Sequence, residues 1–159
     1  MRESRSGIGY DAHAFGGEGP LMLCGVEVEH SSGLVGTSDA DVAVHAVCDA
    51  MLGAAAIGDI GQYFPSSDPQ WKDANSLDLA RQCMTMLHDR GFELSNVDVT
   101  IVAESVRVSP HREQMRQALG SALSTQIQAI SIKATTTDGL GWIGRDEGIA
   151  AMAIVTLQR

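Results

Sequence analysis

The sequence predicts an α/β sandwich in which helices cover one face of a sheet. Segments with strand and helix periodicity follow the order strand, strand, helix, helix, strand, helix, strand, strand, which is typical of this class. Of the 159 residues, 44% are hydrophobic but only 4% are aromatic, so we expect an aliphatic core. The length suits one domain over residues 1–159, because a chain of this size can bury a core without disulfides.

Two strands open the predicted order. Residues 8–15 and 21–28 carry the apolar runs expected of strands, and the glycines and proline of residues 16–20 favour a turn between them. The second strand is expected to bend at Gly25.

A long apolar helix and a loop come next. Ser38 or Asp39 can cap a helix over residues 41–56, and Gly58 ends it. Residues 59–73 lose this periodicity and collect glycine, serine and proline, so a surface loop is predicted there. Loops of this length are often functional.

The second half of the chain alternates between helices and strands. Asn75 or Ser76 can cap a second helix that stops at Gly91, and Pro110 opens a third. Strands are predicted at residues 97–103, 131–135 and 149–157, with a glycine-rich loop at 136–146. Both faces of the last strand are apolar, so we expect oligomerisation to cover the face opposite the helices.

The charge balance excludes some partners. The formal charge is −9, with 20 acidic and 11 basic residues and no basic cluster, which argues against nucleic acid and anionic membrane surfaces. The start is polar, the apolar stretch 42–57 is too short to cross a bilayer, and the three cysteines are scattered. These features predict a cytoplasmic protein.

A candidate metal site comes from two segments. Asp11 and His13 are two residues apart in a predicted strand, so both project from the same face, and His45 can join them from the first helix. One carboxylate and two imidazoles suit zinc, and three protein ligands leave a fourth position open, as in catalytic sites. A chance tripeptide and an ordinary helix histidine would give the same pattern.

Two carboxylates share the helix face of His45. Asp41, His45 and Asp49 are spaced i, i+4, i+8. One carboxylate could accept the N–H of His45 and fix its tautomer for metal binding. Alternatively, the three residues form the wet face of an amphipathic helix.

A third polar group runs from a strand end into the glycine-rich loop. Hydroxyls, glycine N–H groups and an arginine are groups that bind phosphate oxygens. Alternatively, the segment is an edge strand followed by an ordinary turn and binds no ligand. Its members are Lys133, Thr135, Thr136, Thr137, Asp138 and Arg145.

These segments occur together with others in one order. The motifs are GYDAHAF at 9–15, SDADVAVHA at 38–46, GDIG at 58–61, FP at 64–65, NVDVT at 96–100, KATTT at 133–137 and GRDEG at 144–148. Over residues 7–157 the chain closely resembles the 2-C-methyl-D-erythritol 2,4-cyclodiphosphate synthase family.

The resemblance implies a homotrimer of ferredoxin-like subunits with a mixed sheet, acting as a lyase in non-mevalonate isoprenoid biosynthesis. The substrate, 4-diphosphocytidyl-2-C-methyl-D-erythritol 2-phosphate, uses its own 2-phosphate to attack the β-phosphorus, and CMP leaves. No protein nucleophile is needed, so the protein has to position the substrate, neutralise charge and stabilise the leaving group.

The resemblance also implies site residues. Asp11, His13 and His45 would hold Zn²⁺, and a second cation, Mg²⁺ or Mn²⁺, would bridge the diphosphate near Asp138, with Thr136 as the other catalytic position. The segment around the methylerythritol part comprises Asp59, Gly61, Phe64, Ser66 and Asp68. The nucleotide pocket, on a neighbouring subunit, comprises Ala103, Arg107, Ser109, Ala134, Thr135 and Thr136. Further substrate-binding positions are Ser38, Trp142 and the phosphate-binding Arg145, near the trimer axis.

The chain departs from the family pattern at substrate and second-metal positions. Thr37 replaces a usual His, Ala40 a Gly, Ser66 an Asp, residues 106–109 a Pro-Lys segment, Asp138 a Glu and Asp146 a Gly. The alternatives are therefore a weakened paralogue that binds metal and an isoprenoid diphosphate as a trimer, and a zinc phosphoester hydrolase. The hydrolase would need a general base that nothing in the sequence requires.

Overall fold

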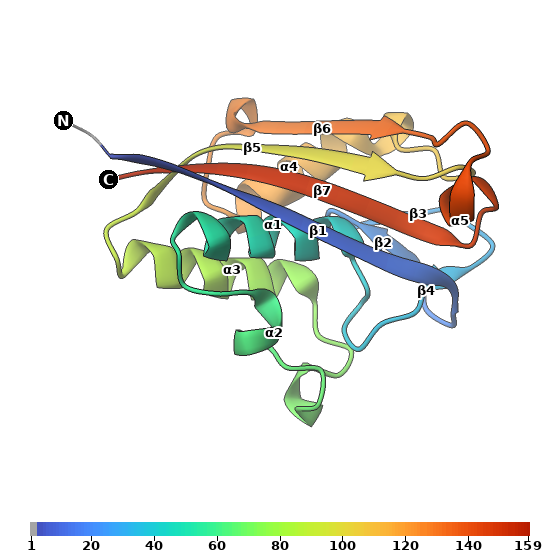
Figure 1. Ribbon diagram of the computed structural model, residues 1–159, viewed down its shortest axis with the longest axis horizontal. Coiled ribbons are helices and arrows are strands. Elements are labelled where there is room, and N and C mark those ends of the chain that lie inside the picture. Colours follow the sequence, from blue (N-terminus) through green and yellow to red (C-terminus); the bar gives the residue numbers. More distant parts are fainter. Residues whose placement is uncertain (1–2) are drawn as a thin grey trace.

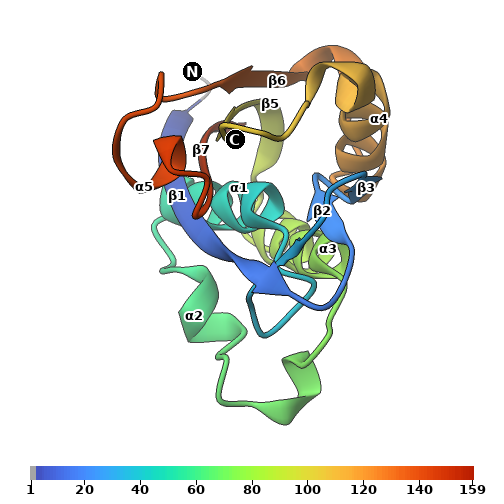
Figure 2. The ribbon, with the colours of Figure 1, turned by 90° about the vertical axis from the view of Figure 1, so that its right-hand side faces the viewer.

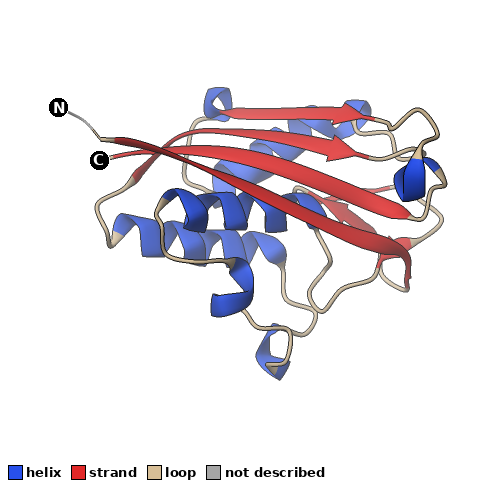
Figure 3. Ribbon diagram, in the orientation of Figure 1, coloured by secondary structure: helices blue, strands red, loops and turns tan. Residues whose placement is uncertain are grey.

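Helices pack on one face of a mixed sheet in the computed structural model, which describes residues 3–159 (Figures 1 and 3). The sheet has the order β4-β1-β7-β5-β6, and only β5 and β6 are parallel. Its strands are β1 (Ser4–Gly17), β4 (Gly33–Leu34), β5 (Glu93–Val102), β6 (Ile130–Thr135) and β7 (Gly148–Gln158). The long helices are α1 (Val42–Ala54), α3 (Ser76–His88) and α4 (Arg112–Ala122). The predicted fold class is confirmed.

The segment at 21–28 reverses direction, which corrects the expected bent strand. It forms β2 (Leu21–Leu23) and β3 (Val26–Val28), which pair with each other in a separate antiparallel sheet. Cys24 and Gly25 have φ values of 49° and 76°, and two successive positive φ values are the signature of a tight hairpin turn.

The first helix begins and ends differently from the prediction. Asp41 caps it by accepting the N–H of Val44, so neither Ser38 nor Asp39 is the cap. The helix ends at Ala54, before Gly58, and the N–H of Ile57 returns to the carbonyl of Leu52. Asn75 caps α3, as predicted.

Both predicted loops contain short helical turns. Residues 59–73 include α2 (Ile60–Tyr63) and a 3₁₀ turn at Pro69–Trp71, and residues 136–146 include α5 (Gly141–Gly144). Further 3₁₀ turns occur at Ser109–His111, ahead of α4, and at Ile127–Ala129. Figure 2 shows α2 and the 59–73 segment extending away from the sheet.

Close packing of α1 on β1 prepares the site. A Cβ on Gly9 would lie 1.8 Å from the carbonyl oxygen of Ala46, and one on Gly7 would lie 2.1 Å from that of Ala50. Only glycine permits this approach. Asp11 and His13 lie on the same face of β1 as these glycines, so the helix brings His45 close to them.

Where β1 and β7 pair, the sheet face opposite the helices carries exposed apolar side chains. Ala151, Ala153 and Val155 point into the core, whereas the exposed fractions of Met152 and Ile154 are 42% and 48%. Their register partners in β1, Tyr10 and Ile8, are 57% and 69% exposed. Among residues 3–159, no helix has the length and apolar character to cross a membrane.

Candidate metal centre

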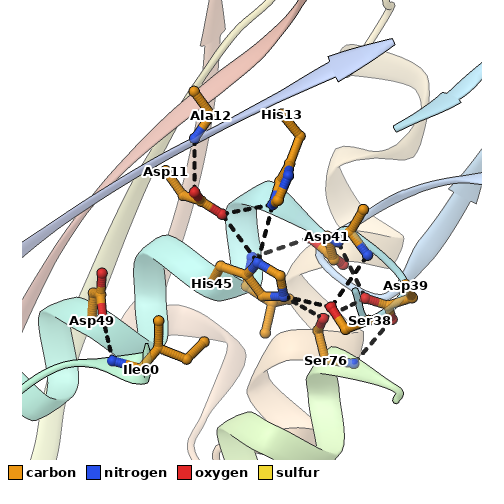
Figure 4. A network of polar contacts seen from close by, with 12 residues as sticks. Asp11, Ala12, His13, Ser38, Asp39, Asp41, His45, Asp49, Ile60 and Ser76 are labelled. Carbon is orange, nitrogen blue, oxygen red and sulfur yellow. Dashed lines mark hydrogen bonds and ion pairs between the residues drawn. The ribbon is translucent and has the colours of Figure 1, made fainter. Parts of the chain in front are cut away.

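The structure brings Asp11, His13 and His45 together as strand parity predicts (Figure 4). The Oδ2 atom of Asp11 lies 2.9 Å from Nε2 of His13 and 3.0 Å from Nδ1 of His45. The two ring nitrogens are 3.3 Å apart, and all the donor atoms lie within 4.8 Å of one another. All three side chains are partly buried, with the donors facing one point.

Asp11 and His13 shift each other's pKa values. Burial acts to raise the pKa of Asp11, but the hydrogen bonds with His13 and His45 outweigh it and hold that pKa well below its usual range. The hydrogen bond that Nε2 of His13 donates to Asp11 raises the pKa of His13. A positive charge is therefore favoured between the carboxylate and the rings, whether a proton or a metal ion supplies it.

A hydroxyl relay fixes the tautomer of His45. Ser76 Oγ donates to the carboxylate of Asp39, so it must accept the hydrogen bond from Nε2 of His45, at 2.9 Å. Ser38 Oγ lies 3.0 Å from the same nitrogen. Because Nε2 donates to Ser76, Nδ1 is the His45 nitrogen that faces Asp11 and His13. Nδ1 becomes a metal ligand when its proton is displaced, so this donor set fits a divalent metal ion.

Asp41 and Asp49 accept hydrogen bonds from backbone N–H groups, which corrects the prediction that one of them orients His45. Asp41 is fully buried and accepts the backbone N–H groups of Cys24, Gly25 and Val44. Its burial raises its pKa, against the effect of those hydrogen bonds. Asp49 accepts the N–H of Ile60 at 2.7 Å. Among the described residues, neither carboxylate is hydrogen-bonded to the His45 ring, and the full burial of Asp41 rules out a wet face for these three residues.

A cleft opens beside the cluster, between α1 and the 59–73 segment. Of the predicted substrate residues, Ser38, Gly61, Phe64 and Ser66 line it, together with Thr37. Asp59 and Asp68 instead cap short helical turns by accepting the N–H groups of Gln62 and Gln70. Trp71, Leu79, Ile60 and Asp49 also line this cleft, and the sequence prediction missed them as lining residues.

A second cleft lies after β5 and at the end of β6. All of its predicted residues line it, namely Ala103, Arg107, Ser109, Ala134, Thr135 and Thr136. None of these residues lines the cleft of the metal cluster in the same chain. The two predicted halves of the site are therefore separate within one chain.

The predicted phosphate cluster is dispersed. Lys133 pairs with Asp98 at 2.7 Å, and Arg145 pairs with Glu147 at 2.6 Å. Asp138 is exposed, with a φ of 53°, and is hydrogen-bonded to the hydroxyl of Thr136. Asp138, Trp142 and Arg145 line neither cleft.

The fold and the cluster define an α/β protein with a carboxylate and two-histidine metal site held between its first strand and first long helix. More particularly, the chain belongs to the YgbB family, which matches residues 4–158.

Its relatives are similar over nearly the whole chain. It is 52% identical over 155 residues to 2-C-methyl-D-erythritol 2,4-cyclodiphosphate synthase of Shewanella sp. (strain W3-18-1), covering 98% of this chain and 96% of the relative. The identity to the same enzyme of Pseudoalteromonas atlantica is 47%, with the same coverage of both chains. The predicted resemblance is confirmed.

Solved structures agree. The bifunctional IspDF from Campylobacter jejuni has a TM-score of 0.96 and 40% identity; the match covers 99% of this chain but 43% of that one. A CDP complex of IspF from Plasmodium falciparum has a TM-score of 0.85 and 28% identity, covering 97% and 95% of the two chains.

Proposed function

We propose that this protein is a 2-C-methyl-D-erythritol 2,4-cyclodiphosphate synthase, built as one domain over residues 1–159 and acting in the cytoplasm in non-mevalonate isoprenoid biosynthesis. One observation carries the proposal. Relatives of that name match nearly the full length at about half identity. The convergence of the Asp11, His13 and His45 donors agrees with this.

In this reaction the protein binds and orients the substrate. An oxygen of the 2-phosphate forms a bond to the β-phosphorus, the bond from that phosphorus to the bridging oxygen breaks, and CMP leaves with that oxygen. Both nucleophile and leaving group belong to the substrate, so the gain comes from proximity and charge neutralisation. Arg107 supplies positive charge in the second cleft. Arg112, Glu104 and several hydroxyl side chains also line this cleft.

Asp11, His13 and His45 are the residues that would hold zinc, one ion per chain. Bound there, zinc supplies Lewis acidity and positive charge to the phosphates. Asp138, held by Thr136, is the proposed ligand of a second divalent cation, Mg²⁺ or Mn²⁺.

The proposed assembly is a homotrimer in which the second cleft of one subunit faces the metal cleft of the next. Two observations support this. The two clefts are separate within a chain, and the sheet face carrying Ile8, Tyr10, Met152 and Ile154 is apolar and exposed. A relative was solved as a CDP complex, which supports a cytidine nucleotide as ligand, and the family resemblance assigns that ligand to the second cleft.

The test is direct turnover. Purified protein, loaded with zinc and magnesium, is incubated with the diphosphocytidyl substrate while phosphorus NMR follows the products. We expect CMP and the cyclic diphosphate in equal amounts, and loss of both in His45→Ala. Linear products from water attack would indicate a hydrolase instead.

A second candidate rests on the departures in the metal cleft, where Thr37 and Ser66 offer neither an imidazole nor a carboxylate. A weakened paralogue would bind zinc and an isoprenoid diphosphate as a trimer but release no CMP. The same assay separates the two.

A further inference from the structure

A second hydrogen-bond network joins His30, Ser105 and Asp146, which lie far apart in the sequence. Ser105 Oγ donates to Oδ1 of Asp146 at 2.8 Å and lies 3.1 Å from Nε2 of His30. Nδ1 of His30 lies 3.2 Å from the backbone nitrogen of Ser32 and 2.9 Å from its carbonyl oxygen.

The donor and acceptor in each of these hydrogen bonds follow from the chemistry of the side chains. A carboxylate only accepts, so the single hydroxyl proton of Ser105 goes to Asp146. Nε2 of His30 must then be the donor to Ser105. The ring of His30 also stacks on Phe15, with the centroids 4.6 Å apart and the planes at 13°. The histidine is therefore held on its face as well as at both nitrogens.

The hydrogen bonds of Ser105 add a polar tie to a segment whose Ala103, Val106 and Val108 side chains are buried in the core. Ser105 belongs to residues 103–109, which line the second cleft and include Arg107. The ends of this segment are fixed by backbone hydrogen bonds, from Ala103 to Thr135 and from His111 to Val108. Between them, Ser105 provides the side-chain link to the neighbouring turn.

Asp146 occupies a position that suits glycine better. Its φ is 58°, in the left-handed region that non-glycine residues adopt at a cost, although Asp and Asn tolerate it best. Glycine would relax the backbone here but would lose the carboxylate that meets Ser105. The use of an aspartate therefore points to a task for its side chain.

We propose that His30, Ser105 and Asp146 form a positioning chain that keeps residues 103–109 in the shape required by the nucleotide end of the substrate. This inference rests on the proposed function. The chain fixes Ser105 two residues before Arg107 and Asp146 directly after Arg145, so it also couples the second cleft to the turn that carries Arg145. Ser105 lines the second cleft, whereas His30 and Asp146 do not and act on the cleft through Ser105.

The experiment compares Ser105→Ala and Asp146→Gly with the wild type and with Asp146→Asn, which keeps an acceptor oxygen and tolerates the same φ. The matched control is Asp73→Gly, an exposed aspartate with a φ of 58°. CDP affinity is measured by calorimetry in the presence of magnesium. Hydrogen exchange is followed in peptides covering residues 103–109, with zinc content and melting temperature alongside.

We expect Ser105→Ala and Asp146→Gly to weaken CDP binding and raise KM about threefold to tenfold, the range set by losing one such hydrogen bond. The value of kcat and the zinc content should change little, and exchange at 103–109 should quicken. Asp146→Asn should restore most of the affinity, and Asp73→Gly should match the wild type. Asp146→Gly should not lower the melting temperature, because its backbone relaxes.

Unchanged exchange at residues 103–109 in both variants would overturn the proposal, and so would faster exchange with unchanged CDP affinity. A wild-type protein that neither binds CDP nor releases CMP would refute the proposed function instead. In that case the hydrogen-exchange data still show whether His30, Ser105 and Asp146 hold residues 103–109 in place.

Discussion

Ser76 Oγ lies 2.9 Å from Nε2 of His45, although 31 residues separate them in the sequence. The proton of His45 is thus directed by the first residue of α3 and, behind it, by Asp39. The ability of His45 to bind metal through Nδ1 depends on how α1 and α3 pack together.

Removing this hydroxyl should weaken metal binding without removing a ligand. Ser76→Ala should lower zinc affinity by roughly 10- to 100-fold, the usual effect of losing a partner that orients a metal-binding histidine. Competition with a chromogenic chelator measures it. Thr85→Ala, on the exposed side of the same helix, should bind zinc like the wild type. Equal affinities in Ser76→Ala and the wild type would show that the relay does not set the tautomer.

Zinc should stabilise the protein more at about pH 8 than at about pH 6. In the metal-free protein the lowered pKa of Asp11 contributes stability above about pH 4, which is lost as the pH falls toward that lowered pKa. The raised pKa of His13 contributes stability below about pH 6.5, which is lost as the pH rises through the raised value.

The cluster therefore stabilises the metal-free protein most between about pH 4 and pH 6.5, where a proton occupies it. Zinc must displace that proton at low pH. Melting curves with and without zinc across this range provide the test, and a zinc effect that grows toward acid pH would contradict the coupling.

The glycine contact between β1 and α1 should control the site geometry. Gly9→Ala places a Cβ against the carbonyl oxygen of Ala46, so we expect a loss of about 1–3 kcal/mol in the free energy of unfolding. Zinc affinity should fall as well, because α1 carries His45. Gly19→Ala, whose Cβ would meet nothing within 4 Å, serves as the control. Chemical denaturation and zinc titration would refute this if both glycine variants behaved alike.

Asp138 should matter for turnover and not for zinc. Asp138→Ala should keep the zinc content and slow the reaction on the order of 10²–10³-fold, the usual effect of losing one preorganised electrostatic group. Asp138→Glu tests whether a longer side chain at this position binds the second cation better. The glutamate should raise the rate or lower the magnesium requirement if the shorter side chain weakens the site. Full activity of Asp138→Ala with unchanged magnesium dependence would show that the second cation binds elsewhere.

The sequence predicted the parts of this molecule that depend on local periodicity. Strand parity placed Asp11 and His13 on one face, and the alternation in residues 149–157 indicated a strand apolar on both sides. The cap of α1 was misplaced because Ser38, Asp39 and Asp41 are all capping residue types. Asp41 also accepts N–H groups from Cys24 and Gly25, contacts that only the folded chain supplies.

The same reason explains the other errors. The hairpin at Cys24 and Gly25 has a non-glycine residue at positive φ, for which no local signal exists. Ser76 reaches His45 only through helix packing, so no spacing rule could have found it. Lys133 was predicted to bind phosphate, but it forms an ion pair with Asp98. That ion pair depends on the pairing of β5 with β6, which the sequence does not reveal.

In the proposed assembly, each active site takes its metal cluster from one subunit and its nucleotide cleft from the neighbouring subunit. Subunit complementation distinguishes this shared site from a site contained within one chain. His45→Ala and Arg107→Glu each damage one half of the site, so each homotrimer should release little CMP. Unfolding the two variants together and refolding them as a mixture should restore about a quarter of the wild-type rate, the share of interfaces with both halves intact in random cyclic trimers. A mixture that stays as inactive as its components, beside a wild type refolded to full activity, would contradict the claim.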